Sequence, residues 1–455
     1  MMPSCHPLMA LSDMISKMAN QATDPFGTGV ESPRYLTQEI PGIGGVIKAR
    51  AEDFLVEEIP LYRPSGEGEH IYLFLEKQGL TTLQLRDAVA HHFKVHRKAI
   101  GHAGLKDKHA VTRQVISVHT PGKLPEDFPS FQHDRARVLW VDQHSNKLQR
   151  GHLAGNRFSI KVRNVDPLGV RSAKAALDML ARVGVPNRFG VQRFGYLMNN
   201  HQVGRALIVG DYQTALDLIL SPKEGAPKGS INARDAYRSG DYASAAELMP
   251  KVFKLERNAL RSLAKGDPPE VAIRAIDPTA AGFFISSFQS AVFNNVLNQR
   301  VEAGSLNQFE AGDIAFVLKN RSTFSITPQE LSAKATDLEA RIDSFELSPS
   351  GPMWGTSMPL AEGFVAQREL DALARAGVTP KDMELCEQRD GLPMIGGDRR
   401  PLTIPVIDPE VEGGLDEHGA YIRCAFELPR GSFATTVMDE IMKVSSDAVE
   451  MTHGS

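Results

Sequence analysis

The sequence predicts an α+β protein with a mixed, largely antiparallel sheet and an inserted, helix-rich second domain of α/β type. Three observations lead to this prediction. Short segments rich in β-branched and aromatic residues alternate with helical patterns from about residue 36 onward. The chain becomes mostly helical after residues 187–195. The β-like texture then resumes near the end, at "GAYIRCAFELPRG", as expected for a domain interrupted by another one.

Residues 1–34 are expected to form a flexible N-terminal extension. A short amphipathic piece is followed there by the polar stretch "NQATDPFGTGVESPR", which is rich in Gly, Pro, Ser and Thr. No motif with a chemical function is visible in this segment.

Residues 35–212 and 408–455 are assigned to the first domain. Its strand-like segments are, in order, "GGVIKAR", "FLVEEIP", "HIYLFLEK", "VISVHT", "RVLWVDQH" and "NRFSIKVRNV". The helical pattern "TTLQLRDAVAHHF" lies between them and begins after a Thr cap.

Residues 213–407 are assigned to the inserted domain. The phrase "GDYQTALDLI" at residue 210 recurs as "GDYASAAELM" at residue 240, which indicates two related helix–turn–helix units. Two copies are too few for a solenoid. Farther along, short strands and Gly/Pro-rich loops surround one helix at "LAEGFVAQRELDALARAG".

The composition is that of a globular protein, and it excludes several classes. The formal net charge is -4, so any nucleic-acid site must be a local patch. The three cysteines, Cys5, Cys386 and Cys424, are too few and too far apart for a disulfide framework or a thiolate metal site. We find neither a membrane-length apolar run nor a secretion signal, and we therefore expect a cytoplasmic protein without membrane contact.

Two basic blocks indicate a surface for a polyanion. Residues 86–114 and residues 134–163 each contain seven Lys or Arg against two acidic residues. Neutralisation of phosphates by such groups drives nucleic-acid affinity. A solvated face of mixed charge explains the same composition and stays open as the alternative.

The segment "NRFGVQRFG" combines aromatic, amide and guanidinium groups in one short turn. An aromatic face can stack on a base while Arg and Asn contact phosphates and base edges. The side chains concerned are Asn187, Arg188, Phe189, Gln192, Arg193 and Phe194. A further aromatic residue, Phe158, lies among the charges of the second basic block, in "GNRFSI". Taken singly, each Phe is more typical of a core position.

Metal and cofactor motifs are missing from the sequence. The histidines of the first block, His91, His92, His96, His102 and His109, do not have the spacing of a zinc site. No Walker A loop, dinucleotide fingerprint or Gly-x-Ser-x-Gly elbow is present. We therefore expect no metal and no cofactor.

Asp107 lies between two lysines in "GLKDKHAVTRQ". In an extended segment Lys106 and Lys108 point to the face opposite Asp107, whereas in a turn one of them can reach it. An Asp107 kept ionised in a pocket would, in the extended case, need a cation from elsewhere, because desolvation raises the pKa of a carboxyl. Lys48 and Arg50 are the upstream candidates. A solvent-exposed Asp in a mixed-charge strand is the simpler alternative.

The stretch "AGLKDKHAVTRQ" resembles the signature of the TruD family of tRNA pseudouridine synthases, approximately Gly-x-Lys-Asp-x-x-Ala-x-Thr-x-Gln. Further segments resemble other motifs of the family in order: "KARAEDFLVEEI", "GEGEHIYLFLEKQGLTT", "LAGNRFSI", "NRFGVQRFG", "SFQSAVFNNVL" and "LPRGSFATTVM". The resemblance extends over residues 36–445, and a series of this length is very specific.

The resemblance implies an isomerase that converts uridine to pseudouridine in tRNA, at uridine 13 in bacterial relatives, without metal or cofactor. It implies a pseudouridine-synthase-like catalytic domain interrupted by a TRUD domain, and a monomer without an obligatory protein partner. The family's catalytic aspartate falls on Asp107 and its basic partner on Lys48. Contacts to the flipped-out nucleotide are expected from Phe54, Asn187, Phe189, Phe433, Gln192 and Arg193. Whether Asp107 attacks the sugar or the base, or removes a sugar proton, stays open.

Two other functions fit parts of the sequence. A non-catalytic RNA-binding protein would use the basic blocks alone and show a steep salt dependence of binding. A metal-dependent RNA hydrolase would use the histidines and would be inhibited by a chelator.

Overall fold

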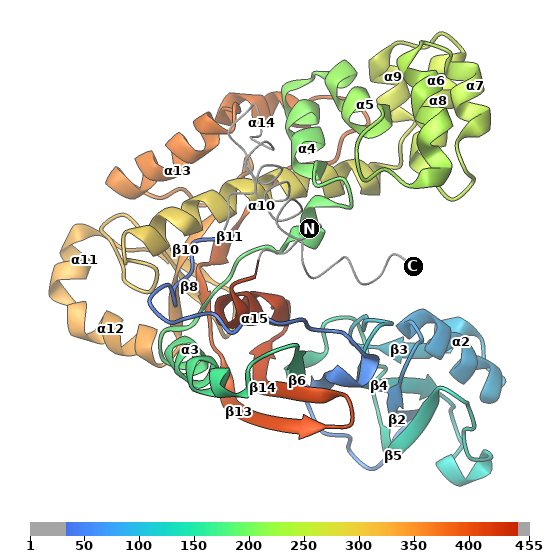
Figure 1. Cartoon of the computed structure of the whole chain (residues 1–455), viewed down its shortest axis with the longest axis vertical. Helices are drawn as coiled ribbons and strands as arrows, with labels where there is room; N and C mark the ends of the chain where they lie inside the picture. Colours follow the sequence, from blue (N-terminus) through green and yellow to red (C-terminus); the bar gives the residue numbers. More distant parts are fainter. Residues whose placement is uncertain (1–32, 445–455) are drawn as a thin grey trace, which may run out of the picture. The chain divides into compact units, whose positions relative to one another are not determined.

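The computed structural model describes residues 33–444 (Figure 1). The extension expected at residues 1–34 lies almost wholly outside the described residues. The rest divides into two compact units, which we call the sheet unit (35–187 and 403–444) and the helical unit (188–402). In the described part of the chain, no helix is both long enough and apolar enough to cross a membrane.

The sheet unit contains one eight-stranded sheet. The strand order is β13-β14-β6-β1-β4-β2-β5, and β3 also pairs with β4. Only the pairing of β1 with β4 is parallel, so the expected mixed, largely antiparallel sheet is confirmed. The strands are β1 (Phe54–Pro60), β2 (His70–Lys77), β3 (Ile100–His102), β4 (Val111–His119), β5 (Ala136–His144), β6 (Leu153–Arg163), β13 (Ile407–Asp416) and β14 (Gly419–Pro429).

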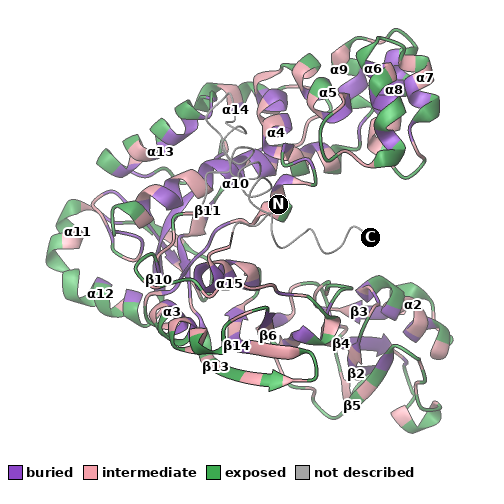
Figure 2. Ribbon diagram, in the orientation of Figure 1, coloured by how far each residue is buried: buried purple, intermediate pink, exposed green. Residues whose placement is uncertain are grey.

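Helices cover two parts of this sheet. The helix α2 (Thr82–His92) begins at Thr81, which forms a capping box with Gln84, and its Leu85 packs on the apolar side chains of β2. The helices α3 (Val170–Val183) and α15 (Ala434–Met442) pack on the side chains of β6 and β14. Figure 2 shows the resulting buried layers. β7 (Val185–Pro186), at the end of the first half of the unit, pairs with β12 (Thr403–Ile404), at the start of the second half.

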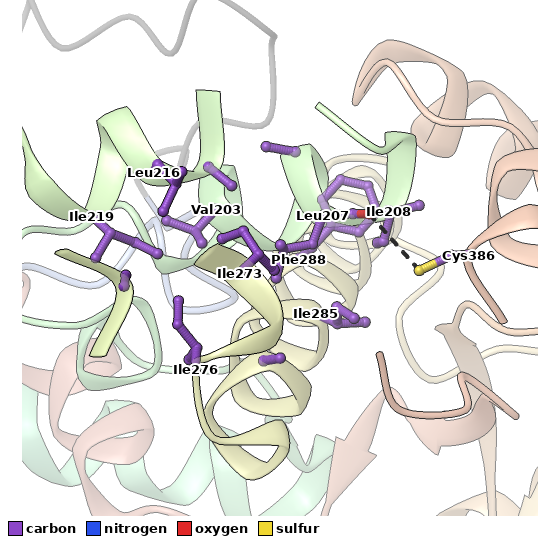
Figure 3. Close-up of a cluster of buried hydrophobic side chains, with 14 of the residues drawn as sticks. Val203, Leu207, Ile208, Leu216, Ile219, Ile273, Ile276, Ile285, Phe288 and Cys386 are labelled. Atoms are coloured by element: carbon purple, nitrogen blue, oxygen red, sulfur yellow. Dashed lines mark hydrogen bonds between the residues drawn. The ribbon is translucent and has the colours of Figure 1, made fainter. Parts of the chain in front are cut away.

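The helical unit is built around the long helix α10 (Pro278–Glu302). Its Ile285 and Phe288 pack against Val203 and Leu207 of α4 in the largest apolar cluster (Figure 3). The other helices are α4 (Asn200–Val209), α5 (Tyr212–Leu220), α6 (Ile231–Arg238), α7 (Tyr242–Leu248), α8 (Lys254–Ala264), α9 (Pro269–Arg274), α11 (Pro328–Ala333), α12 (Ala335–Asp343), α13 (Gly363–Arg375) and α14 (Pro380–Glu387). A four-stranded sheet in the order β11-β10-β8-β9 completes the unit, with β8 (Ile314–Val317), β9 (Thr323–Ser325), β10 (Leu347–Met353) and β11 (Asp398–Pro401).

The repeated "GDY" phrases form equivalent turns, one between α4 and α5 and one between α6 and α7. Gly210 and Gly240 have φ angles of 80° and 82°, a left-handed conformation that favours glycine. The carboxylates of Asp211 and Asp241 then accept hydrogen bonds from the backbone N–H groups of Thr214 and Ser244, at 3.1 and 3.0 Å. The two related helix–turn–helix units expected from the sequence are present.

The boundaries between the units differ from those expected. They lie at 187/188 and 402/403, whereas the sequence placed them after residue 212 and before residue 408. The first difference arises because α4 packs closely on α10: a Cβ added to Gly204 would lie 2.0 Å from the carbonyl oxygen of Phe284. At the second boundary, the backbone N–H of Leu402 donates to the carbonyl of Pro349 at 2.8 Å and so belongs to the helical unit.

Candidate active site

Asp107 lies in the loop that joins β3 to β4, outside both strands. Lys106 points into the protein, where its ammonium lies 3.0 Å from the Glu58 carboxylate and 2.6 Å from the side-chain oxygen of Asn156. Lys108 is exposed. Neither of the two flanking lysines is an ion-pair partner of Asp107.

The cation at Asp107 is Lys48. Its Nζ lies 2.7 Å from Asp107 Oδ2, and it also lies over the ring of Phe54, 4.8 Å from the centroid. Lys48 has a φ angle of 58°, which is unusual for a residue with a side chain and is a form of strain common at functional sites.

The segment that carries Lys48 is fixed by Arg163 at the end of β6. The backbone of Arg163 exchanges two hydrogen bonds with Val46, at 2.8 and 2.9 Å. Its buried guanidinium donates to Asp53 at 2.6 Å and to Asp416 at 2.6 Å. Lys48 is therefore held between two points where its segment is tied to the sheet.

The surroundings of Asp107 favour its ionised form. Partial burial tends to raise the pKa of the carboxyl. The hydrogen bond from Lys48, a 2.9 Å hydrogen bond from the backbone N–H of His109 and the Lys48 charge outweigh this effect, and the pKa lies below its usual value. The carboxylate is about one-third exposed, with a relative side-chain accessibility of 36%. Asp107 is thus an oriented carboxylate that a substrate can reach.

Other residues of the "GLKDKHAVTRQ" stretch hold the loop in place. The hydroxyl of Thr82, at the start of α2, accepts from the backbone N–H of Lys106 at 2.9 Å and donates to Gln114 at 3.1 Å. Ala110 and Thr112 are fully buried at the start of the strand that follows. The residues around Asp107 therefore serve to attach its loop to α2, β1 and β4.

The remaining expected contacts in the sheet unit differ in exposure. Phe54 is 5% exposed and packs edge-on against Phe158, so it reaches the site only through Lys48. Asn187 is buried directly after β7. Phe433 is 49% exposed at the start of α15. No described hydrogen bond, ion pair or ring contact joins Phe433 to Lys48 or Asp107.

Phe189, Gln192 and Arg193 belong to the helical unit. Asn294 of α10 holds the backbone of Phe189 by two hydrogen bonds of 2.9 Å. The guanidinium of Arg193 donates to Ser290 and Ser286 at 3.2 and 2.7 Å and lies 5.6 Å from the Phe189 ring centroid. Gln192 is exposed.

The two basic blocks are partly neutralised by the fold. Acidic residues from other strands pair with many of their cations, namely Lys106, Arg113, Arg137, Arg157, Lys161 and Arg163. Arg86 and Arg97 both pair with Asp87. Within the described residues, the cations of the blocks that form no ion pair are Lys94, Lys98, Lys108, Arg135, Lys147 and Arg150. The alternative of a mixed-charge face therefore describes much of both blocks.

The histidines of the first block do not converge. His92 contacts the carbonyl of Pro129 at 2.9 Å, whereas the ring of His96 accepts from the backbone N–H of Lys98 at 3.1 Å. Across residues 33–444, no three His, Cys, Asp or Glu side chains come together as metal ligands would.

Sequence reasoning missed two buried groups beside the Asp107 loop. One is Glu58, the partner of Lys106. The other is Lys77, whose ammonium donates to the backbone carbonyl of Asp107 at 2.9 Å. Lys77 follows Ile71, Leu73 and Leu75 at every second position of β2, on the apolar face of the strand. A lysine at such a position could have indicated a buried cation from the sequence alone.

Comparison with known proteins identifies the family. The model of the family described as tRNA pseudouridine synthase D (TruD) matches residues 31–441. The chain belongs to the TruD family. Among its relatives, tRNA pseudouridine synthase D of Geobacter metallireducens is 40% identical over 412 residues, which cover 90% of this chain and 98% of the relative. The protein of the same name from Thermus thermophilus is 33% identical, over 90% of this chain and 92% of the relative.

A solved structure supports the family and the fold. The chain is similar to a crystal structure assigned as tRNA pseudouridine synthase D from Methanosarcina mazei, with a TM-score of 0.79 and 28% sequence identity. The match covers 91% of this chain and 97% of that one. The α+β fold expected from the resemblance to the TruD family is therefore confirmed.

Proposed function

We propose that this TruD-family isomerase converts uridine 13 of tRNA to pseudouridine, with Asp107 as the catalytic carboxylate. The observation that carries the proposal is the state of Asp107: ionised, partly exposed and oriented by Lys48 at 2.7 Å and by the backbone of His109. The choice of uridine 13 rests on the likeness to the family.

The reaction only rearranges atoms of the substrate. The bond between N1 and C1′ breaks, the uracil turns, and a bond forms between C5 and C1′. The proton on C5 is lost, and N1 gains one, so neither an oxidant nor a reductant is needed. Asp107 can attack C1′, attack C6 of the base or remove a sugar proton. Each route requires the ionised carboxylate and is helped by a cation that fixes its direction.

The substrate uridine must leave the base stack before Asp107 can reach it. We assign contacts with the flipped nucleotide to Phe54, Asn187, Phe189, Phe433, Gln192 and Arg193. The exposed ring of Phe433 suits stacking on a base, and Arg193, which forms no ion pair within the described residues, suits a phosphate. Phe54 is buried and would act through the Lys48 side chain that lies on its ring.

The proposal is tested by incubating the protein with unmodified tRNA and mapping new pseudouridines by position. We expect one at uridine 13 with the natural chain. Asp107→Asn should lower the rate at least about 1,000-fold while the dissociation constant for tRNA stays within about twofold, because the substitution keeps the shape and removes the charge. The control is Asp178→Asn, at an exposed pair on α3.

Three outcomes would contradict parts of the proposal. Full activity of Asp107→Asn would refute its role. Pseudouridine at another position would refute the target. Tight tRNA binding with no pseudouridine from the natural chain would favour a non-catalytic RNA-binding protein.

A further inference from the structure

Lys77 is a buried cation without a carboxylate side chain as its hydrogen-bond partner. It is 1% exposed at the end of β2, and its ammonium donates to the backbone carbonyls of Leu80 at 2.6 Å and of Asp107 at 2.9 Å. Its cross-strand neighbours, Thr112 and Ala136, are uncharged. A buried charge is costly, and an apolar residue would continue the core formed by the rest of this face of β2. Stability alone therefore does not account for a lysine here.

The two carbonyls belong to segments that meet at the Asp107 loop. Leu80 lies just before α2. Thr82, the first residue of α2, accepts a hydrogen bond from the backbone N–H of Lys106 at 2.9 Å. The start of α2 thus holds one side of Asp107 through Thr82, and Lys77 holds the other side through the Asp107 carbonyl. The carboxylate itself is bound separately by Lys48. The backbone and the side chain of Asp107 are fixed by different lysines.

We propose that Lys77 is a positioning residue for the reaction, which fixes the backbone of Asp107 so that the carboxylate meets the substrate in one orientation. This inference rests on the proposed role of Asp107. Lys77 lies beneath the loop and contacts main-chain oxygens, so it acts through Asp107 and not on the nucleotide. A small displacement of a catalytic group is enough to slow a reaction strongly.

The charge of Lys77 adds a measurable property. Burial lowers its pKa to about 8, with the nearby ammonium of Lys106 acting in the same direction and the carboxylate of Asp107 opposing it. Above this pH, the neutral amine still donates to the carbonyls, but charge-assisted hydrogen bonds are about twice as strong as neutral ones. The hold on the loop therefore weakens as Lys77 loses its proton.

The test compares Lys77→Met with the natural chain in single-turnover reactions at saturating enzyme. We expect the rate constant to fall about 10- to 100-fold while the dissociation constant for tRNA stays within about twofold. Amide exchange of residues 105–109 should become faster. Lys77→Arg keeps the charge and should recover part of the rate. The natural chain should also slow as the pH rises through about 8, and Lys77→Met should lack this step.

Arg234→Met is the matched control. Arg234 of the helical unit is also fully buried and donates to two backbone carbonyls, those of Ile219 at 2.8 Å and Ser221 at 3.1 Å. This variant should lose stability but keep the rate constant of its folded fraction. An equal loss of rate in Arg234→Met, or a rate of Lys77→Met within about threefold of the natural chain, would overturn the inference.

Two further results separate the possible failures. If Lys77→Met does not fold, Lys77→Gln, whose shorter side chain removes the charge and the contacts with both carbonyls, takes its place. A rate constant within about threefold of the natural chain then overturns the inference. Asp107→Asn is measured in parallel. An active Asp107→Asn refutes the proposed function, whereas an inactive Asp107→Asn beside a fully active Lys77→Met refutes only the role of Lys77.

Discussion

The Asp107 loop of the sheet unit and the Arg193 segment of the helical unit hold their cations differently. Lys48, Lys77 and Lys106 each contact an oxygen acceptor in or beside the Asp107 loop. Arg193 instead lies on the rings of Phe189 and Phe283, at 5.6 and 4.9 Å from their centroids, and donates to two serine hydroxyls. The three lysines are bound to oxygen atoms of the protein and therefore fix the position of the loop. A guanidinium that has no carboxylate partner is better suited to binding an anionic ligand.

Lys106→Met should have the largest effect, and it acts on stability. It leaves the Glu58 carboxylate buried without its cation, and loss of one partner of a buried pair costs about 3–5 kcal/mol. Burial already raises the pKa of Glu58, with Lys106 opposing the rise, so the variant should take up a proton there. Denaturant unfolding measures the loss.

Two variants serve as controls for this prediction. Lys174→Met breaks an exposed pair on α3 and should cost less than about 0.5 kcal/mol. The double variant Lys106→Met/Glu58→Gln should be less destabilised than Lys106→Met alone, because the unpaired carboxylate is gone. Equal stabilities of the single and double variants would show that the unpaired Glu58 carboxylate is not what destabilises Lys106→Met.

Lys48→Met should have the next largest effect, on the pH dependence of the reaction. Without the Lys48 hydrogen bond, burial acts unopposed by that group and the pKa of Asp107 rises. In the proposed reaction Asp107 must be ionised, and the ionised form is lost as the pH falls through the folded-state pKa. The acid limb of the rate should therefore move to higher pH. Near pH 7 we expect a loss of about 10- to 100-fold from poorer orientation.

The matched control is Lys108→Met, since Lys108 is exposed beside Asp107 and does not bind its carboxylate. Its acid limb should coincide with that of the natural chain. If the acid limb of Lys48→Met is also unchanged, Lys48 does not set the ionisation of Asp107.

Arg193→Gln should have the smallest effect, and it acts on binding. We expect about a tenfold weaker affinity for tRNA and a salt dependence lower by about one counterion, with an unchanged rate constant at saturating enzyme. Arg238→Gln, at an exposed pair with Asp235 in the same unit, is the control and should leave the affinity unchanged. A lower rate constant with unchanged affinity would assign Arg193 to the chemical step instead.

The secondary structure and the turns could be predicted from the sequence, whereas the ion-pair partners of the basic residues could not. Periodicity gave the α+β class, and the "GDY" phrases gave two equivalent turns because Gly and Asp act there on their own neighbours. The basic blocks could not be interpreted in this way. Arg157, for example, pairs with Glu410 and Glu427, which lie more than 250 positions away in the sequence. They meet it only because β6 pairs with β14 and β14 pairs in turn with β13.

The sequence by itself determined the family and drew attention to Asp107, because each motif is a short stretch of chain and both the motifs and their order can be read without the fold. It also showed that an ionised Asp107 in a pocket would need a cation, with Lys48 among the candidates. Only the tertiary structure decided which lysine meets which oxygen. Lys48 and Asp107 are 59 positions apart, and Lys77 reaches the same loop from β2. Such contacts depend on strand register and on which face of the sheet is covered, and both are set by the packing of the whole unit.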